Sequence, residues 1–271
     1  MTILQSIVLG IIQGLTEFIP VSSTAHLLLA QHFFNWQIPE AFKFDVLVQL
    51  GTLLALIVYF WRDLVSIILA VLQGLWNRQP FADPQARLGW YLVLATIPAS
   101  IVGLVLKKVV EALFANPGVE AVIRLLISAM VLFIAERFGR KDRTLNSLGW
   151  LDALWVGIAQ ILAVFPGSSR SGSTIFGGML RGFDRPSAAR FAFLLAVPTM
   201  LGAGLVEGIG LLKVPNLSQI LPDFAVGFLV AAVVGYLSIR WLLGYLNRHS
   251  LYVFSAYCAL VGLVVLGTLI L

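Results

Sequence analysis

Long apolar segments, separated by short polar loops, dominate the sequence. They fall at roughly 44–61, 90–110, 120–137, 191–210, 224–243 and 252–271. Each segment approaches the roughly 20 apolar residues that a helix needs to cross a lipid bilayer. Two further apolar stretches, one near the start of the chain and one near its middle, are interrupted by a proline and a run of serines. The pattern predicts six membrane-spanning helices and two broken ones.

The first interruption lies in the stretch Q-G-L-T-E-F-I-P-V-S-S-T-A-H, residues 13–26. Residues 4–18 predict a helix about 22 Å long, which is shorter than the roughly 30 Å hydrocarbon core of a bilayer. Pro20 ends this helix because it lacks an N–H group and its ring clashes with the carbonyl four residues earlier. Side-chain oxygens of Ser22, Ser23 and Thr24 are suited to cap a second helix. We therefore expect a re-entrant hairpin, which enters the bilayer and returns to the same side.

The second interruption, residues 157–174, repeats the pattern of residues 10–24. Both contain Gly-Ile-x-Gln, followed by leucine, phenylalanine, proline and a pair of serines. Counted from Gln13 and Gln160, the next apolar segments begin 31 residues further on in both cases. Such self-similarity indicates an internal duplication.

The duplication predicts an all-α integral membrane protein, in which residues 1–271 form a single polytopic membrane domain with halves 1–138 and 150–271. Each half contains one broken re-entrant helical hairpin followed by three transmembrane helices. Because three crossings are an odd number, the second half enters the membrane upside down, as in inverted-repeat proteins with a site near the midplane. The tips of the two hairpins are therefore expected to meet inside the bilayer.

Composition and charge agree with this architecture. Hydrophobic residues make up 59% of the chain and charged ones 11%, and the mean hydropathy is +0.95. This balance is typical of integral membrane proteins and excludes nucleic-acid binding as the main role. The net charge of +5 comes from basic loops. Twelve basic residues fall on one side of the membrane, namely Arg62, Arg78, Arg87, Arg137, Arg140, Lys141, Arg143, Arg181, Arg185, Arg190, Arg240 and Arg248. Only Lys43, Lys107, Lys108 and Lys213 fall on the other, so both termini and the opening of the first hairpin are expected outside the cytoplasm.

Ionisable and hydroxyl side chains are concentrated at the two interruptions. A carboxylate and an imidazole at membrane depth, here Glu17 and His26, are costly and indicate a functional site. The helices that restart after both serine clusters direct free N–H groups inward, where they favour anions, and Arg170 adds a fork of donors that matches phosphate. The candidate catalytic residues are Glu17, Ser23, His26 and Arg170. The candidate phosphate-binding residues are Ser22, Thr24, Ser168, Ser169, Ser171, Ser173 and Thr174. Gln13, Asp45 and Gln49 are further candidates for the lining of the site.

Other polar residues in the apolar segments are given structural or interfacial interpretations. Glu120, Glu136 and Asp152 lie near helix ends and are expected to be solvated. Arg124 is expected to extend its guanidinium toward the membrane interface. Cys258, the single cysteine, is expected to be a small packing residue.

The two interrupted motifs, Q-G-L-T-E-F-I-P-V-S-S-T-A-H and P-G-S-S-R-S-G-S-T, resemble the signature motifs of the bacterial undecaprenyl-pyrophosphate phosphatase family of the bacitracin-resistance type. The resemblance covers essentially the whole chain. It implies removal of the terminal phosphate of the C55 isoprenyl pyrophosphate in the bacterial cytoplasmic (inner) membrane, which recycles the lipid carrier of cell-wall synthesis. It also implies an entrance on the outer (periplasmic) face and a divalent cation, Mg or Ca, with Glu17 as a metal ligand. Family roles would fall on Glu17, Ser22, Ser23, His26, Ser169, Arg170 and Thr174.

The chain departs from the family pattern at two positions. Gln13 stands where many members have a first glutamate, which weakens the case for a metal site with two carboxylates. Ala25 replaces the usual glycine before the histidine.

The mechanism and one rival function stay open from the sequence. Ser23 is the preferred nucleophile, with His26 as base or acid and Glu17 as metal ligand or proton acceptor, but a phosphohistidine at His26 or attack by water are alternatives. The rival function is an inverted-repeat transporter or flippase for a phosphorylated lipid or a small anion. The expected partners are the polyprenyl pyrophosphate substrate and membrane lipids, with no nucleic acid. The oligomeric state is left open.

Overall fold

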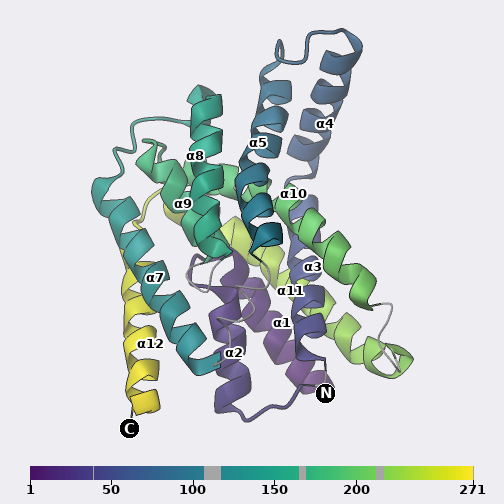
Figure 1. Ribbon diagram of the computed structural model, residues 1–271, viewed down its shortest axis with the longest axis vertical. Coiled ribbons are helices and arrows are strands. Elements are labelled where there is room, and N and C mark those ends of the chain that lie inside the picture. The colour runs from purple at the N-terminus through teal and green to yellow at the C-terminus, as the bar shows by residue number, and fades with distance from the viewer. Residues whose placement is uncertain (39, 107–116, 165–168, 212–216, 271) are drawn as a thin grey trace.

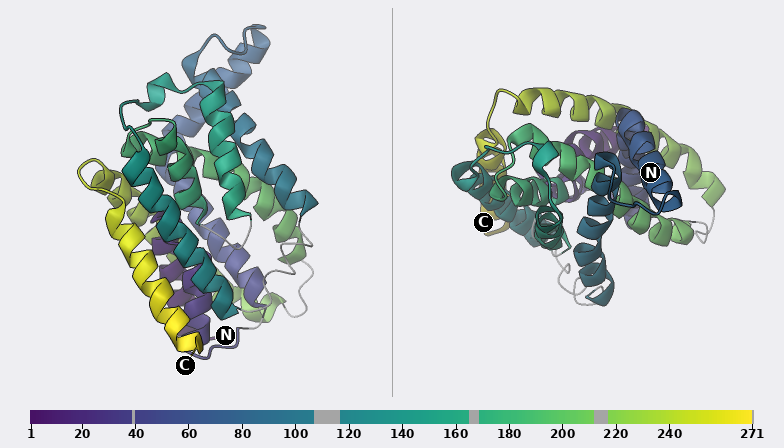
Figure 2. Two further views of the ribbon diagram at one scale, coloured as in Figure 1. Left: turned by 60° about the vertical axis from the view of Figure 1, so that its left-hand side comes forward. Right: turned by 90° about the horizontal axis from the view of Figure 1, so that it is seen from above.

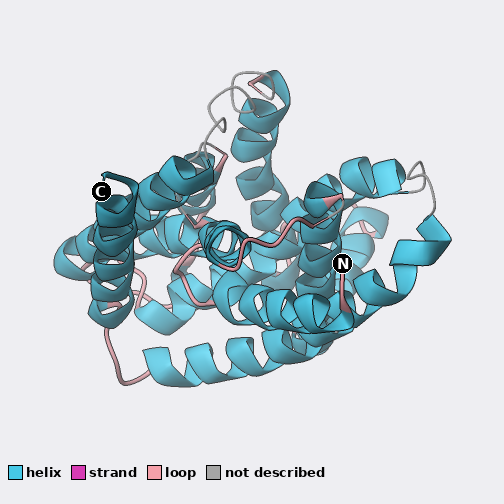
Figure 3. Ribbon diagram, turned by 90° about the horizontal axis from the view of Figure 1, so that it is seen from below, coloured by secondary structure: helices cyan, strands magenta, loops and turns pink. Residues whose placement is uncertain are grey.

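The computed structural model describes residues 1–38, 40–106, 117–164, 169–211 and 217–270. Within these ranges the regular structure is helical, apart from one isolated bridge between Arg143 and Phe183 (Figure 3). The first half contains α1 (Ile3–Phe18), α2 (Ser23–Phe33), α3 (Ala41–Tyr59), α4 (Trp61–Trp76), α5 (Pro84–Val105) and α7 (Pro117–Phe138). The second half contains α8 (Trp150–Gln160), α9 (Arg170–Leu180), α10 (Arg185–Leu211), α11 (Leu217–Leu246) and α12 (Tyr252–Ile270), with short 3-10 helices at Leu145–Ser147 and Ile161–Ala163.

Six of these helices are long and apolar enough to cross a membrane, namely α3, α5, α7, α10, α11 and α12. They coincide with the six apolar segments that the sequence predicts. The helices α1 and α8 are apolar but shorter, and they precede the two interruptions. The protein is therefore an all-α, multi-pass membrane protein, as predicted.

The segment between α3 and α5 differs from the sequence prediction. None of the predicted helices corresponds to α4, which continues to Trp76, and α5 already begins at Pro84, before the predicted segment at 90–110, after a cap in which Asp83 Oδ1 accepts from Gln85 N at 2.6 Å. The apolar run of α4 lies directly after α3 with only Phe60 between them, so hydropathy alone does not separate the two helices. Together α4 and the start of α5 project beyond the rest of the molecule (Figure 1).

The two broken hairpins enter the molecule from opposite ends. In Figure 1, α1 rises from the end where both termini lie and α2 returns to it, whereas α8 descends from the other end and α9 returns there. Their tips are in contact at the centre, where Arg170 forms an ion pair with Glu17. The predictions that α1 ends before Pro20 and that the two tips meet are confirmed.

The two tips restart their helices differently. At the second break Ser169 caps α9, since its Oγ accepts from Gly172 N at 3.2 Å. At the first break Ser22 has a left-handed backbone, with φ of 72°, and makes no side-chain cap. The prediction of a serine or threonine cap is therefore wrong for α2, because the hydroxyl of Ser23 donates to Glu17 instead.

Close packing of α11 fixes the position of α1 and α3. The helix α11 packs against both α1 and α3, and Figure 2 shows α12 lying along α7. A Cβ added at Gly14 would lie 2.7 Å from Val234 Cβ, and one added at Gly51 would lie 2.4 Å from the carbonyl oxygen of Phe228. Small residues of this kind let membrane helices approach closely. The packing holds the end of α1, and with it Glu17, in one place.

Two buried carboxylates brace the end of the molecule opposite the termini. Glu136 and Asp152 are each 3% exposed, so the prediction that they are solvated is wrong. Glu136 accepts hydrogen bonds from Arg185, Lys141 and the backbone N–H of Leu251. Asp152 pairs with Arg143 at 2.7 Å and with Arg181 at 2.6 Å. The basic residues that set the loop charge therefore also satisfy these carboxylates.

Candidate active site

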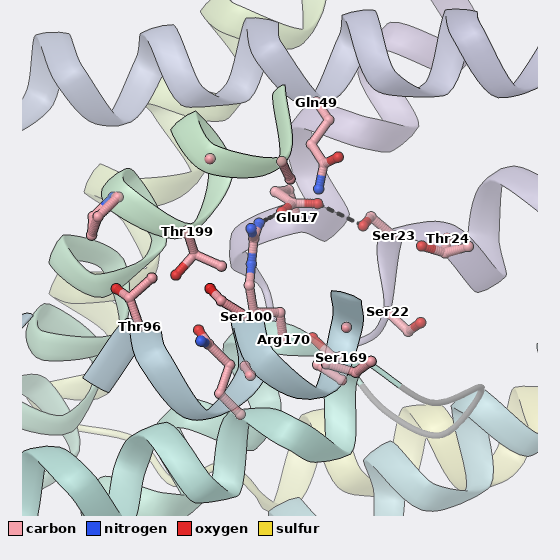
Figure 4. A pocket seen from close by; sticks show the side chains of 18 of the residues that line it. Glu17, Ser22, Ser23, Thr24, Gln49, Thr96, Ser100, Ser169, Arg170 and Thr199 are labelled. Carbon is pink, nitrogen blue, oxygen red and sulfur yellow. Dashed lines mark hydrogen bonds and ion pairs between the residues drawn. The ribbon is translucent and has the colours of Figure 1, made fainter. Parts of the chain in front are cut away.

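A cavity of about 540 Å³ lies where the two hairpin tips meet. The α1–α2 connection and the N-terminus of α9 form one wall, and α5, α8 and α10 form the other (Figure 4). Its polar lining consists of Glu17, Ser22, Ser23, Thr24, Gln49, Thr96, Ser100, Arg124, Gln160, Ser169, Arg170 and Thr199. Most of the predicted site residues of the first tip thus line one cavity.

Glu17, in the last turn of α1, joins the two tips. Its residue is 8% exposed, and its Oε1 pairs with Arg170 Nη2. Its Oε2 accepts from Ser23 Oγ at 2.7 Å and from Gln13 Nε2 at 3.0 Å. Charge-assisted bonds of this kind fix the orientation of the carboxylate. The arrangement gives Ser23 a neighbouring group that is oriented to accept its proton.

A chain of hydroxyl groups fixes the start of α9 against α1. Ser171 Oγ donates to the carbonyl oxygen of Glu17 at 3.0 Å, so the 2.9 Å contact between Ser169 and Ser171 has the Ser169 hydroxyl as its donor. The backbone N–H of Ser169 donates to Ser128 Oγ at 3.1 Å, which ties the same turn to α7. These bonds orient Arg170, the first residue of α9, toward Glu17.

His26 points away from the cavity. Its Nδ1 lies 2.8 Å from the carbonyl oxygen of Ser22, so Nδ1 carries a proton, and in the neutral ring Nε2 accepts from Tyr257 OH at 2.9 Å. The two rings stack with centroids 5.7 Å apart. The side chains of Ser23 and His26 bond other partners and not each other, so a role of His26 as base stays a prediction. The contact that it does make holds the left-handed turn at Ser22 from which Ser23 reaches Glu17.

The remaining predicted residues divide between cavity and core. Gln49 lines the cavity, whereas Asp45, one turn earlier on α3, does not. Ser171, Ser173 and Thr174 are buried in α9 and do not line it either; Thr174 Oγ1, for instance, donates to the carbonyl of Arg170 at 2.8 Å. Ser168 lies outside the described residues.

Comparison with known proteins identifies the family. The family model described as bacitracin resistance protein BacA matches residues 6–264. The chain belongs to the BacA family. It is 42% identical over 274 residues to the undecaprenyl-diphosphatase of Thermomicrobium roseum, with 98% of each chain covered. It is 43% identical over 267 residues to that of Moorella thermoacetica, again with 98% of each covered. A third relative, the undecaprenyl-diphosphatase of Chloroherpeton thalassium, is 42% identical over 280 residues, 99% of this chain and 97% of the relative. The resemblance drawn from the two motifs is confirmed.

The BacA-family chain also has cavity residues that sequence reasoning missed. Thr96 and Ser100 of α5 and Thr199 of α10 are isolated polar residues in apolar helices, and nothing in their spacing marks them. Gln160 is recognisable in the sequence because it occupies the position of Gln13 in the second interrupted motif, but the sequence indicates no role for it. These residues give the cavity its second polar wall.

Arg124 is a further cavity residue whose surroundings differ from the prediction. It lines the cavity and is 9% exposed, and its Nε lies 2.8 Å from an oxygen of Glu120, which is 8% exposed. The predictions of an interfacial arginine and a solvated glutamate are therefore wrong. Each side chain provides the partner that allows the other to be buried.

The described residues do not form a complete metal site by themselves. No group of three or more His, Cys, Asp or Glu side chains that could hold a metal occurs among them. Both oxygens of Glu17 have partners already, and Gln13 supplies an amide where a second carboxylate would strengthen a cation site. Magnesium is commonly held by one or two carboxylates together with substrate phosphates. Glu17 fits a cation only in that shared mode.

Proposed function

We infer that this protein removes the terminal phosphate of undecaprenyl diphosphate, which yields undecaprenyl phosphate and inorganic phosphate. Family membership and the three full-length relatives support this activity, and the family description associates it with bacitracin resistance. The observation that supports the chemistry best is the contact of Glu17 with both Ser23 and Arg170 in the cavity where the two hairpin tips meet. A nucleophile, a proton acceptor and a phosphate-binding cation are thus adjacent. Recycling of the lipid carrier for cell-wall synthesis follows from this reaction.

We propose that Ser23 is the nucleophile. Its Oγ attacks the terminal phosphorus while its proton passes to Glu17 Oε2, which is 2.7 Å away. The bond between this phosphorus and the bridging oxygen breaks, and undecaprenyl phosphate leaves with the bonding electron pair. Water then attacks the phosphoserine, Ser23 recovers its proton from Glu17, and inorganic phosphate is released with the elements of water.

Arg170 stabilises the charge that this reaction concentrates on phosphate oxygens. A guanidinium has five N–H donors, so Arg170 is able to hold Glu17 and bind a phosphate at the same time. The free N–H groups at the start of α9 add to the positive potential. Donors that are oriented before the reaction and shielded from water are the largest single source of catalysis in many enzymes.

Glu17 would be the one carboxylate ligand of a divalent cation bound together with the diphosphate. Such a cation would neutralise negative charge on the phosphate oxygens. The identity of the cation, Mg or Ca, follows only from the family resemblance.

The isoprenyl chain is proposed to leave the cavity between α5 and α10. An apolar groove of about 300 Å³ lies there, lined by Val93, Thr96, Ile97, Ser100, Ile101, Leu104 and Pro198. It shares Thr96, Ser100, Leu104 and Pro198 with the cavity. A chain in this groove keeps its apolar surface away from water, so the diphosphate reaches the polar site while the lipid remains in the membrane.

We also propose an inverted repeat in the cytoplasmic (inner) membrane of a bacterium, with both termini and the entrance on the outer side. The opposed hairpins support the inversion, and so does the packing of α1 on α11 and of its counterpart α8 on α5 (Figure 1). Arg124 of α7 lines the cavity, and α7 begins at the end of the molecule where both termini lie (Figure 1), which supports an entrance there. Loop charge supports the orientation.

Phosphate release from purified protein in detergent, supplied with undecaprenyl diphosphate, tests the proposed activity. We expect release by the wild type and almost none by Ser23→Ala. The matched control is Ser238→Ala, because Ser238 is buried in α11 and bonds only the carbonyl of Val234 in its own helix, at 2.9 Å. A wild type that binds the lipid without releasing phosphate would favour the rival transporter or flippase. Normal turnover by Ser23→Ala would transfer the nucleophilic role to water or His26.

A further inference from the structure

Gln160, the last residue of α8, is a buried polar side chain without a partner. It is 2% exposed and lines the cavity, yet neither Nε2 nor Oε1 has a hydrogen-bond partner in the part of the chain that the structure describes. A buried amide left unpaired costs about 1–3 kcal/mol per group and is rare in native proteins. A group that enters the cavity is therefore the natural partner of this side chain.

The repeat counterpart of Gln160 behaves differently. Gln13 donates from its Nε2 to Glu17 Oε2 at 3.0 Å, so its amide takes part in orienting the carboxylate. The second half has no acidic residue in the position of Glu17, where Val164 stands instead. Duplication has thus left Gln160 without the partner that Gln13 has, on the opposite wall of the same cavity.

Two of the hydroxyl groups in the wall around Gln160 already have acceptors. The hydroxyls of Thr96 and Thr199 donate to carbonyls of their own helices, those of Leu92 at 2.8 Å and Leu195 at 2.9 Å. In Figure 4, Thr96 and Thr199 lie on the side of Arg170 that is away from Ser23. The amide N–H₂ of Gln160 is therefore suited to bind an anionic group that lies beyond the reach of Ser23.

We propose that Gln160 donates a hydrogen bond to the phosphate that stays on the lipid. This inference rests on the proposed function, in which Ser23 attacks the terminal phosphate and the isoprenyl chain leaves between α5 and α10. The retained phosphate is attached to that chain, so it faces the wall that contains Thr96 and Gln160. Gln160 is then a substrate-binding residue that contacts the phosphate carrying the lipid substituent, whereas Arg170 binds the phosphate that Ser23 attacks.

The variant Gln160→Met tests this inference, because methionine has a similar volume and makes no comparable hydrogen bonds. A hydrogen bond to a charged group is worth about 10- to 100-fold in binding. We expect the KM for undecaprenyl diphosphate to rise by about that factor, while kcat changes less than about threefold because an unperturbed Ser23 still reacts. The matched control is Gln73→Met, on the exposed surface of α4 and outside the cavity, which should behave as the wild type.

Product inhibition distinguishes the retained phosphate from the transferred one. For Gln160→Met, inhibition by undecaprenyl phosphate should weaken about 10- to 100-fold, whereas inhibition by inorganic phosphate should be unchanged. Weaker inhibition by inorganic phosphate alone, or unchanged values for both products, would overturn the proposal. Thermal melting of the same preparation should be at or above the wild-type value, and if Gln160→Met does not fold, Gln160→Ala takes its place. Absence of phosphate release by the wild type would instead refute the proposed function itself.

Discussion

The ion pair between Arg170 and Glu17 provides the sharpest test of the site. Its two side chains are 19% and 6% exposed, and they come from hairpins that enter the molecule from opposite ends. Such a pair either links the two tips structurally or supplies, through Arg170, a positive charge that binds phosphate beside the nucleophile. Arg170→Lys separates them, because lysine keeps the charge but loses the planar, two-point grip on a phosphate.

The structure sets the expected sizes of both effects. Loss of one charged donor in a site shielded from water costs about 2–4 kcal/mol of transition-state stabilisation, a factor of roughly 10² to 10³ in kcat. The effect on folding should be smaller than the about 3–5 kcal/mol typical of a broken buried pair, because Glu17 keeps its bonds from Ser23 and Gln13. We therefore expect Arg170→Lys and Arg170→Ala to fold, and to lose at least 10²-fold in kcat.

Phosphate release and thermal melting, measured on the same detergent preparations, decide between the two roles. If the pair is only structural, each single variant should melt early, and the double variant Glu17→Gln with Arg170→Ala should recover stability because no charge is left unpaired. If Arg170 binds phosphate, each single variant should melt close to the wild type and release phosphate poorly. Wild-type turnover by Arg170→Ala would refute the site at the two tips.

Three further predictions concern the cation, the orientation and a buried carboxylate. Glu17→Gln should abolish turnover and cation dependence while Gln13→Ala weakens turnover only several-fold, because Gln13 only orients the carboxylate; equal, near-total losses would contradict this. A reporter fused after Leu271 should be active outside the cytoplasm and one inserted at 140–146 inside it, and the reverse pattern would overturn the proposed entrance. Burial raises the pKa of the Asp152 carboxyl, but hydrogen bonds from its two arginine partners outweigh this and hold the pKa below its usual value. The stability from this depressed pKa is present above about pH 4 and lost as the pH falls through the folded-state pKa. Melting temperatures between pH 6 and pH 3 should therefore fall more steeply for the wild type than for Asp152→Asn, and parallel curves would refute the pairing.

The sequence by itself determined the features that depend on neighbouring residues. Hydropathy over 18 or more residues located all six spans, since the thickness of the bilayer sets that length. Pro20 located the end of α1 because its effect on the helix is local. The spacing from Gln13 and Gln160 predicts a duplication. The two motifs, which are continuous in the sequence, identified the family and most of the first wall of the cavity.

Only the tertiary structure decided which side chains meet. His26 faces Tyr257, which is 231 residues away in the chain, and Ser23 therefore has Glu17 as its partner. Thr96 and Gln160 became cavity residues through the packing of α5 and α8. The physical reason is that lipid tails and a protein core are equally apolar, so a membrane helix has no hydrophobic stripe that shows which face is buried. Which polar residue of an apolar helix faces the cavity is then fixed by close packing between helices that are distant in the sequence.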